Sequence, residues 1–170
     1  MLSIGISALW GLSFWVGLAG TAGADPAGLR GLTRVALEIA MSPDLEALED
    51  EVRRRVEAAL GERPPLLQLD AGSSSRLRLA APVHPHSASA LRGFWLPFSG
   101  QYAIGTVQLA VERRVSLPGG TAPAGPLPAR VWQAERSIAG PWGSVGAQVS
   151  AAVDDLLATF LADYRRARAP

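Results

Sequence analysis

Apolar and polar residues alternate through most of the extended segments of this 170-residue chain, and the alternation limits how its sheet can pack. In residues 32–40 the apolar side chains fall on one face of a strand, and Arg34 and Glu38 fall on the other. Residues 75–83 and 101–117 follow the same pattern. Strands that are buried on both faces read instead as continuous apolar runs. The pattern therefore predicts a sheet that is covered on one face only.

Two amphipathic helices are predicted to supply that cover. Residues 42–61 should form the first, with Ser42 as its N-cap, Pro43 in its first turn and Gly61 ending it in the left-handed conformation. Acidic residues precede arginines by four positions along this helix, which stabilises it. The second helix should span about residues 144–166 and has a wider apolar stripe. The stripe of the first helix consists of Leu45, Leu48, Val52, Val56 and Leu60.

The remaining segments complete the expected order of elements, β-α-β-β-β-β-α. Residues 64–70 and 129–138 are predicted as strands, and residues 118–128, rich in Pro and Gly, as a turn. We therefore expect an α+β fold, a two-layer sandwich in which two helices cover one face of a mostly antiparallel sheet of about four or five strands. The other face is either solvated or an interface, and should carry Arg34, Glu38, Gln68, Arg76, Arg78, Gln108 and Glu112.

The first 24 residues differ from the rest because they contain no Asp, Glu, Lys or Arg. They are mostly apolar and end in Ala22-Gly23-Ala24, the small residues that a signal peptidase reads. We predict a signal peptide over residues 1–24, cleaved after Ala24, and a single domain over residues 25–170. An uncleaved membrane anchor is the alternative, because about 20 apolar residues can span a bilayer. Either interpretation places the domain outside the cytoplasm, in the periplasm or at a membrane.

Composition excludes several functional classes. The chain has no Cys, so disulfides, thiol chemistry and a lipid-modified N-terminal cysteine are all excluded. All 16 basic residues are Arg. The formal net charge is only +1, so no overall field would draw the protein to nucleic acid.

Few residues suggest catalysis, and we predict no enzyme activity, no cofactor and no metal site. His84 and His86 stand in "VHPHS" and could share one side of an extended segment, but no third ligand follows nearby. We favour two solvated loop histidines. Asp154 and Asp155 are adjacent on a helix, so their side chains point about 100° apart and form no natural pair. The Gly-containing segments lack phosphate-loop spacing, and the three Ser at residues 73–75 lack a nucleophile context.

An aromatic stretch, "ALRGFWLPFSGQY" at residues 90–102, stands out in a segment predicted as a loop. It either folds back to cover the sheet edge or forms an exposed contact surface for an envelope protein or a membrane. Pro97 suits an exposed tip, and we favour the contact surface. Trp132 and Trp142 are instead predicted to lie in the core or to cover an edge. The predicted contact residues are Arg92, Phe94, Trp95 and Phe98.

The order of segments resembles small envelope domains of bacteria. The strand "VALEI", the helix ending "VEAALGE", the hairpin strand "YAIGTVQLAVERRV", the strand "VWQ" and the helix "LATFLADYRRA" follow one another between residues 32 and 166. This order resembles the lipopolysaccharide-assembly lipoprotein of the outer-membrane translocon and the N-terminal domain of the Tol-system β-propeller protein. The resemblance implies a non-enzymatic assembly or interaction module. The missing lipoprotein cysteine is a departure from the first family.

Three functions follow as hypotheses. The first is an exported interaction or assembly module that works through strand-edge or loop contacts with a larger partner. The second is a carrier that holds a lipid or another apolar ligand between helices and sheet, with the aromatic loop as its lid. An enzyme of unknown type is third. A sizeable apolar cavity would favour the carrier, and a tightly packed two-layer core with an exposed loop would favour the module. The oligomeric state is open.

Overall fold

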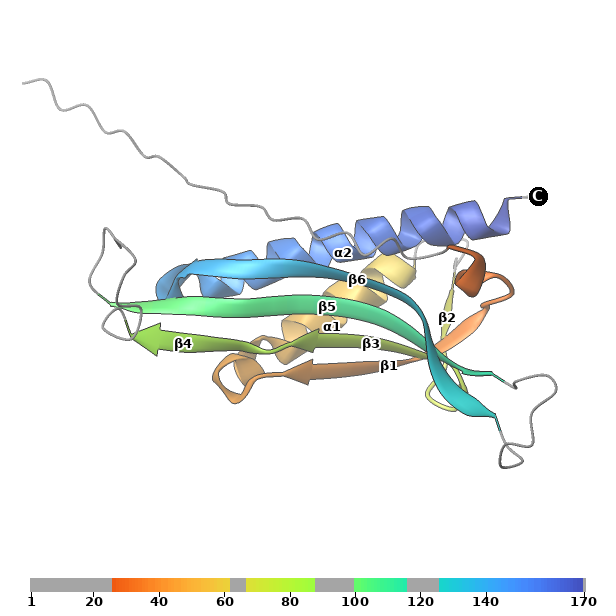
Figure 1. The fold of residues 1–170 in the computed structure, drawn as a ribbon, viewed down its shortest axis with the longest axis horizontal. Helices are drawn as coiled ribbons and strands as arrows, with labels where there is room; N and C mark the ends of the chain where they lie inside the picture. Colours follow the sequence, from red (N-terminus) through yellow and green to blue (C-terminus); the bar gives the residue numbers. More distant parts are fainter. Residues whose placement is uncertain (1–25, 62–66, 88–99, 116–125, 170) are drawn as a thin grey trace, which may run out of the picture.

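A computed structural model describes residues 26–61, 67–87, 100–115 and 126–169 of the chain (Figure 1). Its elements, with η for a 3-10 helix, are η1 (Pro26–Leu29), β1 (Arg34–Met41), η2 (Pro43–Leu48), α1 (Glu49–Leu60), β2 (Gln68–Leu69), β3 (Arg76–Ala81), β4 (Val83–Ser87), β5 (Gln101–Val115), β6 (Leu127–Pro141), η4 (Trp142–Ser144) and α2 (Val145–Arg168).

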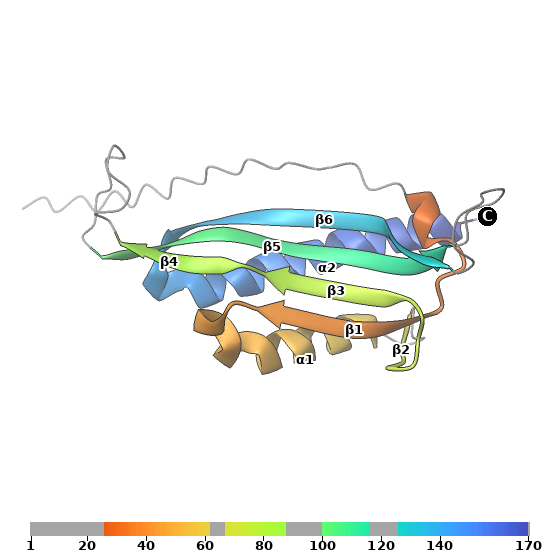
Figure 2. The same ribbon diagram turned by 60° about the horizontal axis from the view of Figure 1, so that its bottom comes forward.

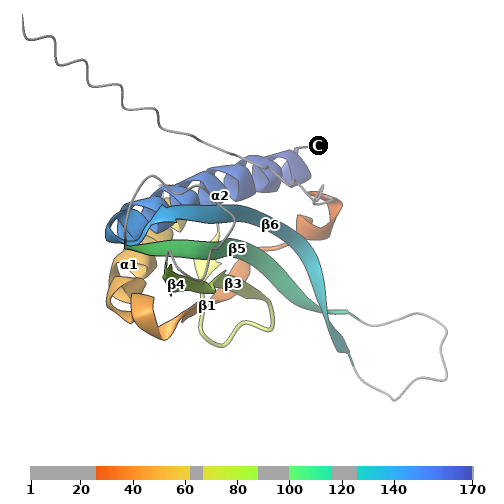
Figure 3. The ribbon, with the colours of Figure 1, turned by 60° about the vertical axis from the view of Figure 1, so that its left-hand side comes forward.

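The elements form two layers, as expected from the alternating strands. The six strands make one mixed, mostly antiparallel sheet, and α1 and α2 pack against the same face of it (Figures 1 and 3). The strand order is β2-β1-β3-β5, with β4 continuing the line of β3 and β6 outside β5. β1 runs parallel to β2 and β3, whereas β5 is antiparallel to β3, β4 and β6. The predicted α+β sandwich is confirmed.

β4 corrects the prediction that the chain enters a loop at His84. Its residues pair with β5, and His84 lies opposite Ile104. The Val83 carbonyl points away from β5, where it accepts a hydrogen bond from Ser42 Oγ at 2.6 Å. Because backbone groups alternate along a strand, Pro85 also directs its missing N–H away from β5 and costs no hydrogen bond within the sheet. A proline in such a position does not end a strand.

The start and end of α1 also differ from the prediction. A 3-10 helix occupies Pro43–Leu48, and the α-helix begins only at Glu49. Ser42 makes no capping hydrogen bond, because its hydroxyl is used by the Val83 carbonyl. Gly61 ends the helix with φ −82°, outside the left-handed region. A tertiary hydrogen bond has therefore replaced the local cap that the sequence pattern favours.

The core lies between the helices and the sheet, and side chains from both layers fill it. Val52 and Val56 of α1 are at most 1% exposed, and Phe160 of α2 is fully buried. Trp132 of β6 is 2% exposed and Trp142 packs against the core, as predicted for both. The fully buried sheet residues include Val35, Leu77, Leu79, Val107, Leu109 and Val111. The core thus meets one of the two conditions expected of the module, and the loop that carries the other lies outside the described residues.

Helix α2, together with η4, is the one helix in the described ranges that is long and apolar enough to cross a bilayer. Its apolar residues, however, face the sheet: Val149, Val153, Leu156 and Phe160 are all fully buried. The helix is therefore built as the core helix of a two-layer domain.

Candidate functional site

Arginines gather at the end of the molecule where α2 ends and β1 and β3 begin, on the right of Figure 1. They come from segments that are far apart in the sequence, and the sheet register brings them together. Arg76 of β3 lies opposite Glu112 of β5, and Glu112 lies opposite Arg130 of β6. We call this surface the basic end. It comprises Arg30, Arg34, Arg76, Arg113, Arg114, Arg130, Arg165, Arg166 and Arg168.

The segment that follows η1 is fastened to this end from two directions. Arg113 Nη1 donates to the Arg30 carbonyl at 2.9 Å and lies 3.3 Å from the Gly28 carbonyl. The Tyr164 hydroxyl of α2 donates to the Leu32 carbonyl at 2.6 Å. Strand, helix and N-terminal segment are thus held together, so the arginines sit on a rigid support.

The described carboxylates at the basic end are fewer than its arginines. Each pair involves an exposed arginine side chain, so the pairs stabilise the fold little and leave the guanidinium groups accessible. The arginines outnumber their partners, and the surface keeps an excess of positive charge. The ion pairs are Arg34–Asp70 at 3.7 Å, Arg76–Glu38 at 3.2 Å, Arg130–Glu112 at 3.8 Å and Arg166–Asp163 at 3.0 Å.

Acidic residues gather at the opposite end, in η2 and the first turn of α1, at the lower left of Figure 1. Acidic residues thus mark one end of the molecule and arginines the other, although Arg53 and Arg55 pair with Glu49 and Glu51 and the net charge is only +1. Net charge does not reveal this arrangement, because it averages over both ends. The arginines at the end of α2 are visible in the sequence. They match the usual preference of helix C-termini for positive charge, so by themselves they do not indicate a binding surface. The acidic residues are Asp44, Glu46, Glu49, Asp50 and Glu51.

The helix-free face of the sheet carries the polar residues that alternation predicted. Glu38 lies between two arginines, 3.2 Å from Arg76 and 3.5 Å from Arg78. Ile104, 40% exposed, is an apolar residue on the same face. Figure 2 shows this sheet with both helices behind it. The face is thus uncovered by any described element.

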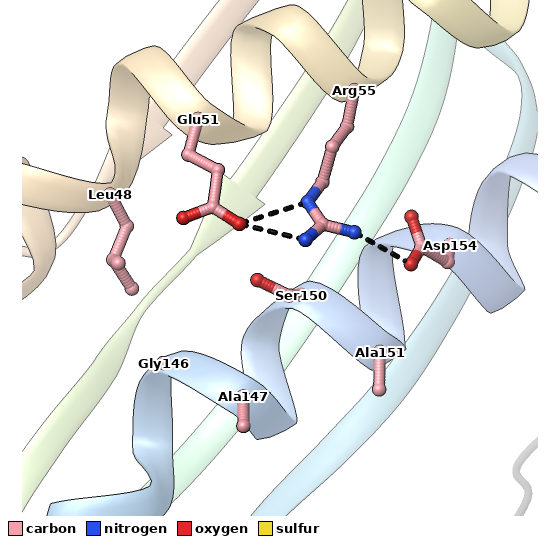
Figure 4. A pocket seen from close by; sticks show the side chains of 8 residues that line it. All are labelled: Leu48, Glu51, Arg55, Gly146, Ala147, Ser150, Ala151 and Asp154. Carbon is pink, nitrogen blue, oxygen red and sulfur yellow. Dashed lines mark hydrogen bonds and ion pairs between the residues drawn. The ribbon is translucent and has the colours of Figure 1, made fainter.

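A groove of about 530 Å³ lies between α1 and α2 (Figure 4). Arg55 bridges it, because its guanidinium donates to Glu51 Oε1 at 2.7 Å and to Asp154 Oδ2 at 2.9 Å. The hydrogen bonds and charge of Arg55 lower the pKa of Glu51, and Glu51 and Asp154 raise the pKa of Arg55. Both shifts favour the charged forms of Glu51 and Arg55. The groove is therefore an ion-paired helix contact lined by small residues, rather than an apolar ligand cavity.

The two histidines and the two adjacent aspartates that the sequence raised as candidate reactive groups lie on different elements, β4 and α2. His84 and His86 are on β4, and His84 Nδ1 is 4.0 Å from Asp44 Oδ2. Among the described residues, no group of three or more His, Cys, Asp or Glu is arranged to hold a metal ion. Asp154 faces Arg55 and not Asp155, as expected for neighbours on a helix.

Two sets of predicted residues lie outside the described ranges. They are the signal-cleavage residues Ala22 and Ala24 and the contact residues Arg92, Phe94, Trp95 and Phe98. Both assignments remain predictions from the sequence.

Comparisons with known proteins give a distant likeness. No protein-family model matches the chain, and no curated protein matches its sequence. Among solved structures it is similar to rare lipoprotein B from Shewanella oneidensis, with 15% identity over 77% of this chain and 91% of that chain and a TM-score of 0.27. The chain thus has a weak structural resemblance to an envelope lipoprotein, the class suggested by its order of segments.

Proposed function

We propose that this chain is an exported, non-catalytic interaction module of the cell envelope, which docks through its basic end onto the anionic headgroups of a membrane. The observation that carries the proposal is that arginines of β1, β3, β5, β6 and α2, together with Arg30 just after η1, lie at one end of the molecule. Guanidinium groups bind phosphate oxygens through paired, charge-assisted hydrogen bonds. A surface of this kind suits phosphate-bearing headgroups.

The path of the chain favours a membrane over an acidic protein. Pro26, the first described residue, belongs to η1 at the basic end, and the uncharged apolar residues 1–24 precede it directly in the sequence. If those residues remain as an anchor, they hold this end of the domain at a membrane, and if they are a signal peptide, they bring it there only until cleavage. Basic residues beside such a segment are typical of contact with anionic headgroups.

The absence of catalysis is part of the proposal. In the groove between α1 and α2, the two carboxylates that line it, Glu51 and Asp154, are both bound by Arg55.

Removing one guanidinium from the basic end should weaken vesicle binding. Arg30 and Arg114 are exposed, and neither makes an ion pair with a described residue. Arg30→Gln and Arg114→Gln should each reduce affinity for vesicles that contain anionic phospholipid about fivefold, because one basic residue near such a surface contributes about 1 kcal/mol. Raising the salt concentration should reduce the difference, since ions screen the attraction. Co-sedimentation with vesicles measures both effects.

Arg54→Gln is the matched control for that experiment. Arg54 is an exposed arginine of α1, outside the basic end, so the same charge is lost without touching the docking surface. Its binding should stay close to that of the unmodified protein. Equal losses for all three variants, or equal binding to neutral vesicles, would contradict the proposal. Binding to an acidic protein but not to vesicles would assign the basic end to a protein partner instead.

Export should be visible at the N-terminus of the native protein. We expect mass spectrometry to find Asp25 as the first residue, because cleavage after Ala24 follows the small-residue pattern. Recovery of the intact chain from Met1 in a membrane fraction would support the anchor instead.

A further inference from the structure

The hydrogen bonds of β1 show which of its backbone groups face outward. The Ala36 N–H donates to the Ser75 carbonyl at 2.8 Å, on the side of β3. The Val35 carbonyl accepts from the Asp70 N–H at 2.9 Å, on the side of β2. Successive residues of a strand direct their N–H and carbonyl groups to opposite sides. The N–H and carbonyl groups of the odd-numbered residues of β1 therefore point toward the side of β2.

β2 is too short to cover that side. It pairs only with Arg34 and Val35, so the N–H and carbonyl groups of Leu37, Ile39 and Met41 meet no described strand. The side chains of these three residues are also only half-buried, although they pack against the core. In Figure 2, β1 is the lowest strand of the sheet, and β2 lies only at its right-hand part. This outer edge of β1 combines unpaired backbone groups with partly exposed apolar side chains.

The opposite edge of the sheet is protected. In β6 the Glu135 carbonyl accepts a hydrogen bond from Arg136 Nη1 at 3.0 Å. A Cβ on Gly28 would lie 2.3 Å from the Val131 carbonyl oxygen, so η1 sits directly against this strand. Charged side chains and covering segments are the usual means of blocking an edge strand. Along Leu37–Met41 no described strand pairs with the outer edge of β1, and the one charged residue there, Glu38, is held by Arg76 and Arg78 on the side of β3.

We propose that the outer edge of β1 pairs with the same edge of a second copy of this chain, antiparallel about a two-fold axis at Ala40. Ile39 then lies opposite Met41 of the second copy, and the two residues exchange both backbone hydrogen bonds. Ala40 lies opposite Ala40 of the second copy on the helix-free face, where a small side chain allows the close approach of a non-hydrogen-bonded pair.

Other registers fit less well. An axis at Glu38 would place two glutamates directly opposite each other, which is destabilising. An axis at Ile39 would bring Ser42 of the second copy into the position that Asp70 occupies beside β1. With the axis at Ala40 the two Glu38 side chains are not opposite each other, and the extended part of the second copy ends at Ser42, opposite Glu38, before it reaches the position of Asp70.

Charge also favours a second copy as the occupant. In the antiparallel arrangement the acidic η2 of one copy, with Asp44 and Glu46, lies near the start of β1 in the other copy, where Arg34 is exposed. The contact occurs twice by symmetry. The basic ends point away from each other at the far ends of the dimer, so the inference goes beyond the proposed docking function and does not depend on it. The short edge implies a weak dimer.

A single cysteine tests the register, because the chain has no other. Ala40→Cys should form a disulfide-linked dimer on mild oxidation, since opposite residues of a non-hydrogen-bonded pair bring their Cβ atoms close enough. Ala139→Cys is the matched control, because Ala139 is an exposed alanine on the same face but in β6. It should cross-link far more slowly. Equal rates for the two variants would overturn the proposal.

Charged substitutions at the axis give a second test that a folding defect cannot imitate. Ala40→Glu and Ala40→Arg should each weaken self-association about fivefold, because like charges then oppose each other. An equal mixture of the two should associate at least as well as the unmodified protein. Sedimentation equilibrium of the exported protein measures all three. An unmodified protein that stays monomeric at high concentration, or a mixture that regains no association, would overturn the proposal and leave the edge to a different chain.

Discussion

Val52→Asp should leave this domain unfolded at room temperature. Val52 is 1% exposed and belongs to the same core cluster as Val153 and Phe160. A carboxylate at this position would be buried among apolar side chains without a partner, which costs several kcal/mol. Domains are stable by only about 5–15 kcal/mol in total, so the substitution removes a large part of that margin. Circular dichroism should show loss of cooperative thermal unfolding.

Ala58→Asp is the control for this experiment. Ala58 lies on the exposed face of the same helix, so the same new residue meets water there. Its melting temperature should fall only slightly, through the lower helix propensity of Asp. If Val52→Asp melted as Ala58→Asp does, the packing of α1 against the sheet would be wrong.

The layers of the fold could be predicted because burial on one face leaves a local signature. In β1 and β3 the apolar residues stand at alternate positions, and Leu77 and Leu79 of β3 are fully buried while Arg76 and Arg78 are exposed. In α1 the spacing of Val52, Val56 and Leu60 marks the buried stripe. Such periods depend only on the geometry of one strand or one helix.

The departures from the prediction come from contacts between distant segments. The hydroxyl of Ser42 meets Val83 across 41 positions, and this contact replaces the expected cap of α1. β4 exists because β5 offers it a partner, although its own residues, "VHPHS", carry no strand pattern. Local propensity is a weak guide where a tertiary partner is available.

The basic end shows the same limit for a functional surface. Arg30 and Arg113 are far apart in the sequence and meet only because the Arg113 guanidinium reaches the Arg30 carbonyl. Net charge could not reveal the cluster, since the acidic end compensates for it. The aromatic contact residues, by contrast, were visible in the sequence as a local cluster, and their assignment remains a prediction.

Phe160→Ala should destabilise the domain strongly. Phe160 is fully buried, and its ring lies 5.2 Å from that of Trp132, edge to face, and 6.0 Å from that of Tyr164, nearly parallel. Truncating a buried phenylalanine to alanine costs about 3–5 kcal/mol, because contacts are lost and a cavity remains. We expect the melting temperature to fall by roughly 10 °C in a domain of this size.

The expected size of this loss follows from how firmly the neighbouring rings are held. Trp132 Nε1 donates to Asp163 Oδ2 at 3.0 Å, and the Tyr164 hydroxyl is anchored on the Leu32 carbonyl. The two rings cannot easily close over the cavity without breaking these buried hydrogen bonds, so relaxation recovers little of the loss. Thr159→Ala, on the neighbouring exposed position of α2, should change stability by less than about 1 kcal/mol. A Phe160→Ala protein as stable as Thr159→Ala would show that the rings do collapse and that the aromatic contacts do not hold α2 against the sheet.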